Sequence, residues 1–246
     1  MLKADFHSHT NYLQKGETNY SPKELIDRAA ELKFDVFCIS EHYVLTKLGE
    51  LLPEYRKYPF ASYGLIKDYA KEKGILLLRS VEIKYPEGEV LLVNFQGNVK
   101  DYPTLKSLEK LPSSVLVIAP HPYFKRSICL GENLEKNIGL FGAVEYAHMY
   151  SSFINLNKKA AAVAARHKKP MVGTSDAHHL LEVGITYTLV DSKKNAGSIV
   201  NAVRAGRIKL VTRPMPAHLF AFIALSNIFK ICAGGIRIMY RLLSGK

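Results

Sequence analysis

Short apolar runs alternate with segments of helical periodicity along most of the chain. Strands buried in a parallel sheet read as nearly continuous apolar runs, and the segments between them carry crossover helices. The apolar runs predict strands at 2–6, 35–40, 75–81, 89–95, 115–119, 142–146, 170–174 and 185–190. The periodic segments predict helices at 22–33, 61–73, 152–168 and 195–205. This order of elements is typical of βα units around a parallel sheet.

Capping residues mark the ends of several predicted helices. Ser21 precedes Pro22, and Glu24 follows the serine by three residues, which is the capping-box arrangement with proline in the first turn. Gly74 and Gly206 follow the second and fourth predicted helices. Glycine suits these positions because it readily adopts the left-handed conformation that ends many helices.

The composition is that of an ordinary globular protein. With 246 residues, 48% of them hydrophobic and 23% charged, the chain suits one large domain or two small ones, and a disordered or fibrous protein is excluded. Cys38, Cys129 and Cys232 lie far apart and form no CxxC motif, which favours a reducing, cytoplasmic compartment. Lys3 and Asp5 interrupt the first residues, so we expect no signal peptide.

Histidines and carboxylates stand near the ends of the predicted strands. They are His7, His9, Glu41, His42, Glu82, His121, Glu145, Asp176 and His178. In parallel α/β barrels functional groups gather at the carboxyl ends of the strands, so these side chains are expected at one rim. Imidazoles and carboxylates together favour zinc, manganese or iron, and the lack of cysteine in the set argues against a structural zinc site. Two such metals support hydrolytic displacement at phosphorus.

The motifs that carry these residues resemble a known family. DFHSHT at 5–10, SEH at 40–42, VEI at 81–83, APHP at 119–122, VEY at 144–146 and SDAH at 175–178 occur in the order found in the polymerase and histidinol phosphatase (PHP) family of metal-dependent phosphoesterases. VGITYTLVD at 183–191 and AVRAGRIKLV at 202–211 are similar to its closing strand and helix. The resemblance covers about residues 1–212.

The resemblance implies an α/β fold, a distorted (β/α)7 TIM-like barrel over residues 1–212, with two or three divalent metal ions (manganese, zinc, iron or magnesium). The first metal would be held by His7, His9, Glu82 and Asp176. Glu82 would bridge to a second metal, which His121 also binds, and a third would be held by His42 and His178. These residues would act catalytically through the metals. The implied enzyme is a hydrolase that cleaves a small phosphate monoester or nucleotide by attack of a metal-bound hydroxide.

Several positions depart from the family pattern. Residues 10–16 read TNYLQKG, with Gln14 near the place where the family has an acidic residue or histidine, and Glu89 stands where the family often has histidine. Glu41 replaces a common aspartate, and Glu145 is either a ligand or a partner of one. Gln14, Glu41, Glu89 and Glu145 are therefore additional candidate ligands. Histidinol phosphatase is a narrower alternative, and a metal-binding regulatory or interaction module or a nuclease-type PHP protein are others.

Cations near the predicted rim could bind a substrate phosphate. Lys125 and Arg126 follow the histidine of APHP closely, and Lys84 shares a strand face with Glu82. His148 and His179 match no motif and are not counted as ligands.

The C-terminal part carries the basic character of the chain. The net charge is +12, and after Asp191 there are ten lysines and arginines and no acidic residue. Residues 213–246 form a separate apolar and basic segment, in which 214–229 is free of charge and Lys230 ends the run short of the ~20 residues that span a bilayer. We predict a helix that packs on the barrel, lies on an anionic membrane surface at the inner face, or spans the membrane. Nucleic-acid binding is less favoured because aromatic residues do not alternate with the charges.

Overall fold

The computed structural model describes residues 1–11, 18–44, 60–124, 128–221, 223 and 225. The chain divides into two compact units, one of residues 1–148 and 156–213 and one of residues 149–155 and 214–246. Within the second unit, the backbone N–H of Met215 donates to the carbonyl of Tyr150 at 2.8 Å, and residues 217–221 are helical. The strands described below all belong to the first unit.

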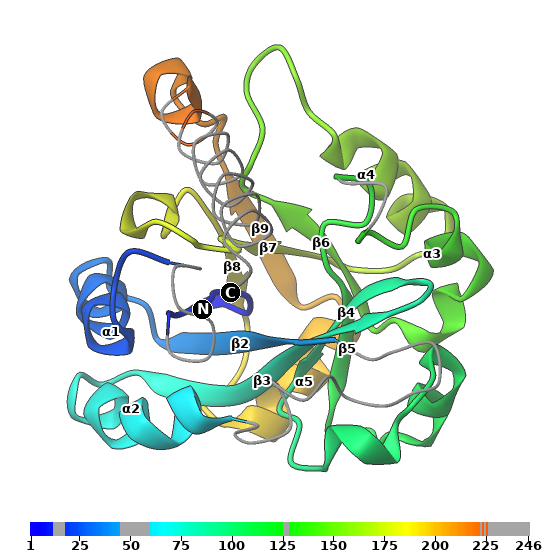
Figure 1. Ribbon diagram of the computed structural model, residues 1–246, viewed down its shortest axis with the longest axis horizontal. Helices are drawn as coiled ribbons and strands as arrows, with labels where there is room; N and C mark the ends of the chain where they lie inside the picture. The colour runs from blue at the N-terminus through cyan, green and yellow to red at the C-terminus, as the bar shows by residue number, and fades with distance from the viewer. Residues whose placement is uncertain (12–17, 45–59, 125–127, 222, 224, 226–246) are drawn as a thin grey trace, which may run out of the picture. The chain divides into compact units, whose positions relative to one another are not determined.

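A sheet of nine described strands forms a nearly closed barrel, in the order β7-β6-β5-β4-β3-β2-β1-β8-β9 (Figure 1). The strands are β1 (Leu2–Asp5), β2 (Val36–Val44), β3 (Leu76–Tyr85), β4 (Gly88–Val93), β5 (Leu116–Ala119), β6 (Ala143–Ala147), β7 (Met171–Thr174), β8 (Thr186–Val190) and β9 (Ile208–Thr212). This confirms the α/β class and the distorted TIM-like barrel. The sheet has nine strands where the resemblance implies seven.

The sheet is mixed, although the apolar pattern predicts a parallel one. Strands β1, β2 and β3 pair in parallel, as do β5, β6 and β7. Strand β4 is antiparallel to both of its neighbours, and β8 is antiparallel to β1 and β9. Only two residues separate β3 from β4. So short a connection can join antiparallel strands but cannot make a parallel crossover.

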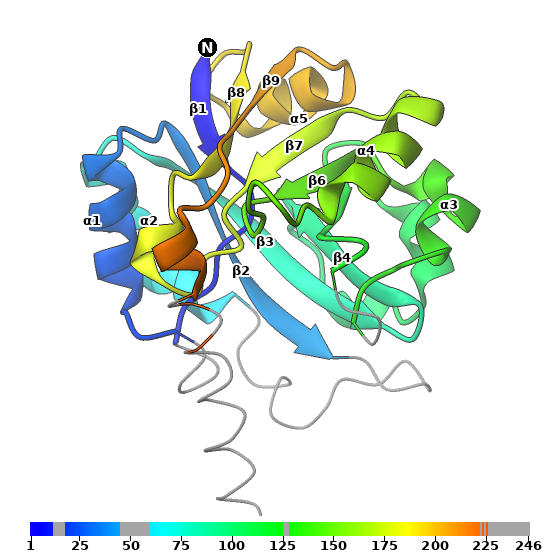
Figure 2. The same ribbon diagram turned by 90° about the horizontal axis from the view of Figure 1, so that it is seen from above.

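The structure describes five α-helices in this unit. They are α1 (Pro22–Glu31), α2 (Ala61–Glu72), α3 (Asn133–Lys136), α4 (Asn157–Arg166) and α5 (Ala196–Arg204). Short 3-10 helices lie at Val99–Asp101, Leu105–Lys110, Ile138–Leu140 and Leu180–Glu182. Figure 2 shows α1 and α2 along one side of the sheet and α3 and α4 along the opposite side.

The helix boundaries follow from side-chain hydrogen bonds. The predicted capping box is confirmed, because Ser21 Oγ accepts from the backbone N–H of Glu24 and the Glu24 carboxylate accepts from the backbone N–H of Ser21. Helix α4 begins at Asn157, five residues later than predicted. The Asn157 amide bonds both the N–H and the carbonyl of Ala147, each at 2.9 Å, and so ties the start of the helix to the end of β6.

Strand alternation divides the core into an inner and an outer set of side chains. Cys38 and Leu78 pack with the inner set and against α5, whereas Phe37 and Leu77 pack with α1 and α2 on the outside. Successive strand residues face opposite sides, so His42 and Glu82, four residues beyond Cys38 and Leu78, share the inner face with them. The interior of the barrel is therefore apolar around Cys38 and Leu78 and polar toward the carboxyl ends of β2 and β3.

Strands β2 and β3 run further than predicted. Their pairing continues through His42↔Glu82 to Val44↔Lys84, so these residues lie within paired strands and not in loops. The additional pairing between the strands fixes the backbone of His42 and Glu82. Thr188 Oγ1 accepts from the N–H of Gly173 and donates to its carbonyl, both at 2.9 Å, and so joins β8 to β7. Among the helices that the structure describes, none is both long and apolar enough to cross a membrane.

Candidate metal centre

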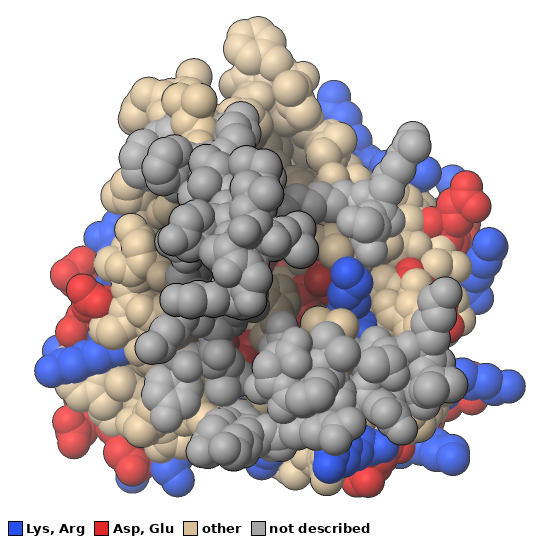
Figure 3. All heavy atoms as spheres, in the orientation of Figure 1, with Lys and Arg blue, Asp and Glu red and all other residues tan. Residues whose placement is uncertain are grey.

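Eight imidazoles and carboxylates from six parts of the barrel converge at the carboxyl ends of the parallel strands. Four overlapping groups of donor atoms, each within 4.8 Å of one another, are formed by His7, His9 and Glu82; His7, His121 and Asp176; His42, Glu82 and Glu89; and His9, His42 and His178. Figure 3 shows Asp and Glu atoms, with a Lys or Arg beside them, in a hollow near the centre of the view.

Glu82 lies at the centre of the cluster and is completely buried. Its carboxylate is 2.8 Å from His42 Nδ1, 3.1 Å from His121 Nε2, 3.4 Å from His7 Nε2 and 3.6 Å from His9 Nε2. Burial by itself would raise the pKa of Glu82, but the imidazoles of His7 and His42 outweigh it and keep this pKa well below its usual value. A buried carboxylate surrounded by four imidazoles is suited to bridge two cations.

Asp176 lies beside both His7 and His9. Asp176 Oδ1 lies 3.0 Å from His9 Nε2 and 3.6 Å from His7 Nε2, and the two histidine Nε2 atoms are 3.0 Å apart. Imidazole nitrogens this close to one another and to two carboxylates are the donor set of a divalent transition metal. The residues present therefore fit the metal ions that the sequence implies.

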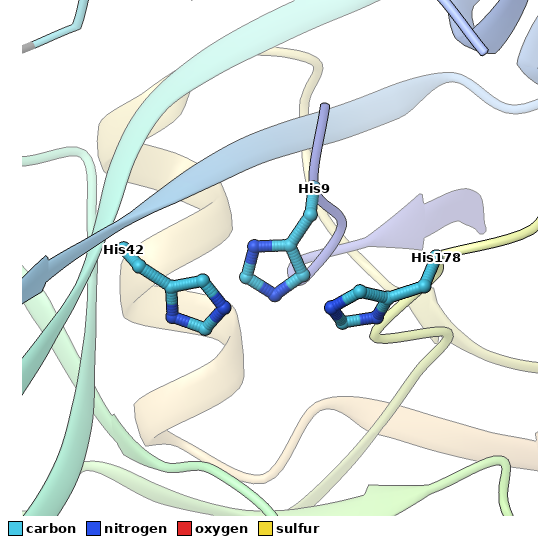
Figure 4. A group of neighbouring side chains, drawn as sticks. All are labelled: His9, His42 and His178. Carbon is cyan, nitrogen blue, oxygen red and sulfur yellow. The ribbon is translucent and has the colours of Figure 1, made fainter. Parts of the chain in front are cut away.

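His9, His42 and His178 form the most accessible group, and their rings face one another in Figure 4. The centroid of the His9 ring is 4.2 Å from that of His42 and 4.7 Å from that of His178. The side chains of His42 and His178 keep 26% and 32% of their area exposed, whereas His9 is fully buried. This group therefore lies between the buried donors and the solvent, where a substrate could reach it.

Glu89 lies on β4 where a histidine was expected and is nearly buried. Its Oε2 lies 3.9 Å from His121 Nε2 and accepts no hydrogen bond from the residues that the structure describes. Burial, and after it the negative charge of Glu82, raises the pKa of Glu89 to about 7. The hairpin places Lys84 directly opposite Glu89.

Glu145 contacts the far side of the donor set. Its buried carboxylate accepts from His7 Nδ1 at 2.9 Å, from the backbone N–H of His121 and from the hydroxyl of Thr174. His7 Nε2 is therefore the nitrogen directed at His9, Glu82 and Asp176. A carboxylate behind a metal-binding imidazole fixes the tautomer and the orientation of the ring.

The other candidates from the sequence lie elsewhere. Glu41 is buried and accepts a hydrogen bond from Thr10 Oγ1 at 2.5 Å, outside the four donor groups. Gln14, Lys125 and Arg126 lie outside the described residues.

Sequence reasoning missed Asp5, which lies fully buried beneath the cluster. Its Oδ1 accepts from the backbone N–H groups of His7 and Ser175 at 3.2 and 3.1 Å. Burial raises the pKa of Asp5 to about 6, partly opposed by its hydrogen bonds with Ser175. An aspartate at the end of a predicted buried strand is unusual enough to have signalled this role.

Two candidate ligands have a strained backbone. His121 and Asp176 have positive φ values of 23° and 42°, which are uncommon for residues other than glycine. Glu145 bonds the N–H of His121, and the N–H of Asp176 donates to the His7 carbonyl at 2.8 Å. Such strain persists where surrounding contacts impose it, and it concentrates at functional sites.

Solved structures share this fold at low sequence identity. A two-domain protein from Bacteroides vulgatus containing a predicted PHP-like metal-dependent phosphoesterase is similar with a TM-score of 0.63 and 20% identity, covering 86% of this chain and 65% of that one. PsfC from Pseudomonas syringae has a TM-score of 0.58 and 15% identity, covering 94% and 98%. The lesion-specific endonuclease PfuEndoQ from Pyrococcus furiosus has a TM-score of 0.54 and 13% identity, covering 85% and 57%.

Family models identify the chain directly. Residues 5–175 match the PHP domain, and residues 155–208 match the PHP-associated model. No protein with a curated description matches the chain. The two matches together include all six motifs from DFHSHT to SDAH. Their extent, over more than half of the sequence, shows that the chain belongs to the PHP domain family.

Proposed function

We propose that the protein is a metal-dependent phosphoesterase that hydrolyses a small phosphate monoester or a nucleotide. The proposal depends on the four overlapping groups of imidazole and carboxylate donors that meet around Glu82 and His9. Divalent ions bound there would lower the pKa of coordinated water and neutralise charge on the phosphate oxygens.

The proposed ligands follow from the donor groups. His7, His9, Glu82 and Asp176 hold the first metal, and Glu82 extends to a second position that His121 and Glu89 complete. His42 and His178 hold a third metal beside His9. These mixed nitrogen and oxygen donors accept manganese, zinc, iron or magnesium, and two or three ions would be bound.

The protein groups around these positions prepare the site. Glu145 keeps the proton of His7 on Nδ1, and the low pKa of Glu82 keeps its carboxylate ionised. We assign substrate phosphate binding to Lys125 and Arg126, which follow His121 in the sequence, and to Lys84 on the β3 face of Glu82. A dianionic phosphate requires such cations once the carboxylates are engaged.

The decisive experiment is a hydrolysis screen over phosphate monoesters and nucleotides, with metal content measured on the same sample. Wild-type protein loaded with Mn²⁺, Zn²⁺, Fe²⁺ or Mg²⁺ should hydrolyse at least one ester, and a His7→Ala/Asp176→Ala variant should lose both metal and turnover. His167→Ala removes a partly exposed histidine paired with Glu135 and serves as the control, expected to keep both. Absence of turnover in the loaded wild type, with unchanged metal binding in the double variant, would refute the proposal.

The same screen separates the alternatives. Histidinol phosphate tests the narrower phosphatase, and single-stranded and lesion-containing DNA test a nuclease, since the fold is shared with a lesion-specific endonuclease. One tightly bound metal without turnover on any substrate would indicate a regulatory or interaction module.

We also infer a cytoplasmic protein whose segment 213–246 binds an anionic membrane surface. Phe153 and Ile154, which belong to the same compact unit as 214–246, are 95% and 56% exposed, and that segment has no acidic residue. Co-sedimentation with phosphatidylglycerol vesicles, and not with phosphatidylcholine vesicles, is expected. A Phe153→Ser/Ile154→Ser variant should bind less, and equal binding to both vesicles or to neither would refute the inference.

A further inference from the structure

A second buried carboxylate network lies behind the loop that carries Asp176 and His178. Glu182 ends the 3-10 helix Leu180–Glu182 and is 1% exposed. Its Oε2 accepts from the backbone N–H of His178 at 2.6 Å and from that of His179 at 2.8 Å. Neither Glu182 nor His148 belongs to the donor groups described above.

Glu182 completes a pattern that is repeated around the centre. Asp5 accepts from the backbone of His7, Glu145 from the backbone of His121, and Glu182 from the backbone of His178. Each ligand-bearing segment after a strand is thus bonded through a main-chain N–H to a buried carboxylate. Through these three bonds the carboxylates hold the backbone in position, and Glu145 in addition bonds the ring of His7.

His148 gives Glu182 a partner from another strand. It follows β6, is 1% exposed, and places Nε2 at 3.4 Å from Glu182 Oε1. Burial would raise the pKa of Glu182, but its interactions with His148 outweigh that effect and lower it. Glu182 also forms the capping box of this 3-10 helix with His179. A capping box needs no imidazole from another strand, so the contact with His148 is additional to it.

The bonds of Glu182 bear directly on the geometry of His178. Its N–H is bonded to Glu182, and its ring Nδ1 lies 2.9 Å from the carbonyl of Asp176. With Nδ1 donating to that carbonyl, Nε2 is the nitrogen left for a metal. Loss of Glu182 would therefore release the backbone of His178, while the N–H of Asp176 stays bonded to the carbonyl of His7.

We propose that Glu182, supported by His148, is a positioning residue that holds the His178 loop in metal-binding geometry before any metal binds. The proposal rests on the proposed metal centre. Loss of such an outer partner costs roughly 10–100-fold in metal affinity. The weakened position should be the one formed by His9, His42 and His178.

The test is calorimetric titration of the metal-free full chain with Mn²⁺, without any phosphate ester. Glu182→Ala should weaken one binding step by about 10–100-fold. Glu182→Gln should stay within about threefold of wild type, because its amide oxygen accepts both N–H groups and its NH₂ group donates to neutral His148. Glu135→Ala is the matched control, because Glu135 also pairs with a histidine, His167 at 2.9 Å, but at the surface.

A second measurement needs no variant. In metal-free wild-type protein the amide hydrogens of His178 and His179 should exchange much more slowly than those of an exposed loop. Fast exchange at both amides would overturn the proposal, as would wild-type affinity in Glu182→Ala or equal weakening in Glu182→Gln. Failure of the proposed function looks different, since the protein would then bind Mn²⁺ with the expected variant effects and hydrolyse no phosphate ester.

Discussion

The replacement of Glu145 by glutamine tests how the protein prepares His7 for a metal. Glu145 Oε1 accepts from His7 Nδ1 and Thr174 Oγ1, and Oε2 accepts from the backbone N–H of His121. A glutamine has one oxygen and one NH₂ group, so a hydrogen-bond donor must take the position of either Oε1 or Oε2. The N–H of His121 cannot become an acceptor, and the glutamine oxygen must therefore face it.

The NH₂ group then faces His7 Nδ1, which has to accept. Once His7 is neutral, as metal binding requires, its proton lies on Nε2, the nitrogen that is 3.0 Å from His9 Nε2 and 3.4 Å from Glu82. For a metal to bind at Nε2, the proton of His7 must return to Nδ1, where it no longer has the charged carboxylate as its acceptor. A hydrogen bond to a charged group contributes roughly 1.5–3 kcal/mol. This corresponds to a loss of about 10–100-fold in metal affinity.

Glu145→Ala has a different consequence, because it leaves three donors without their acceptor. A buried unsatisfied donor costs roughly 1–3 kcal/mol, so the free energy of unfolding of the metal-free protein should fall by about 3 kcal/mol or more. Urea unfolding measures this loss, and calorimetry with Mn²⁺ measures affinity. Glu31→Gln, at an exposed position of α1, is the control.

Two results would refute this reasoning. Wild-type affinity in Glu145→Gln would mean that Glu145 does not set the tautomer of His7. Loss of one whole equivalent of bound metal, with the remaining steps unchanged, would mean that Glu145 is itself a ligand.

Three further predictions concern metal removal, pH and packing. Chelation should lower the thermal unfolding temperature, because Mn²⁺ at a hundred times its dissociation constant stabilises the folded state by about 2.7 kcal/mol; a scan that is unchanged by chelator would contradict this. Metal affinity should rise as pH increases through about 7, because the ligands must release protons to bind a metal. Glu89 has a pKa of about 7, and the pKa values of His7 and His121 are raised above the usual range despite burial. Calorimetry in buffers of different ionisation enthalpy counts the released protons, and a metal affinity that does not change with pH would be the contrary result. Gly173→Ala should lower the free energy of unfolding by about 2 kcal/mol in urea, because its Cβ would lie 2.7 Å from the backbone carbonyl oxygen of Tyr187, which cannot move aside as a side chain could; unchanged stability would show that β7 shifts.

The sequence by itself determined most elements and most of the residues that converge. Apolar runs located β1 to β8, and the serine, proline and glutamate at 21–24 located the start of α1. These features are local, since periodicity and capping depend on residues within one or two turns. The motifs also named His7, His9, Glu82, Asp176 and the other histidines of the donor groups, because each stands near the end of a predicted strand. Glu89 lies instead at the start of β4, and it was named because the family often has a histidine there.

Only the tertiary structure decided which strands pair, how far they extend and which carboxylates face away from the metals. The two-residue connection after β3 reverses β4 and places Glu89 opposite Lys84, and the pairing of β2 with β3 carries both beyond their apolar runs. Asp5 accepts from the N–H of Ser175, Glu145 accepts from that of His121, and Glu182 pairs with His148 from another strand, and nothing near these carboxylates in sequence reveals those partners. A side chain's type can be read from its position, but its hydrogen-bond partner depends on where the rest of the chain has folded.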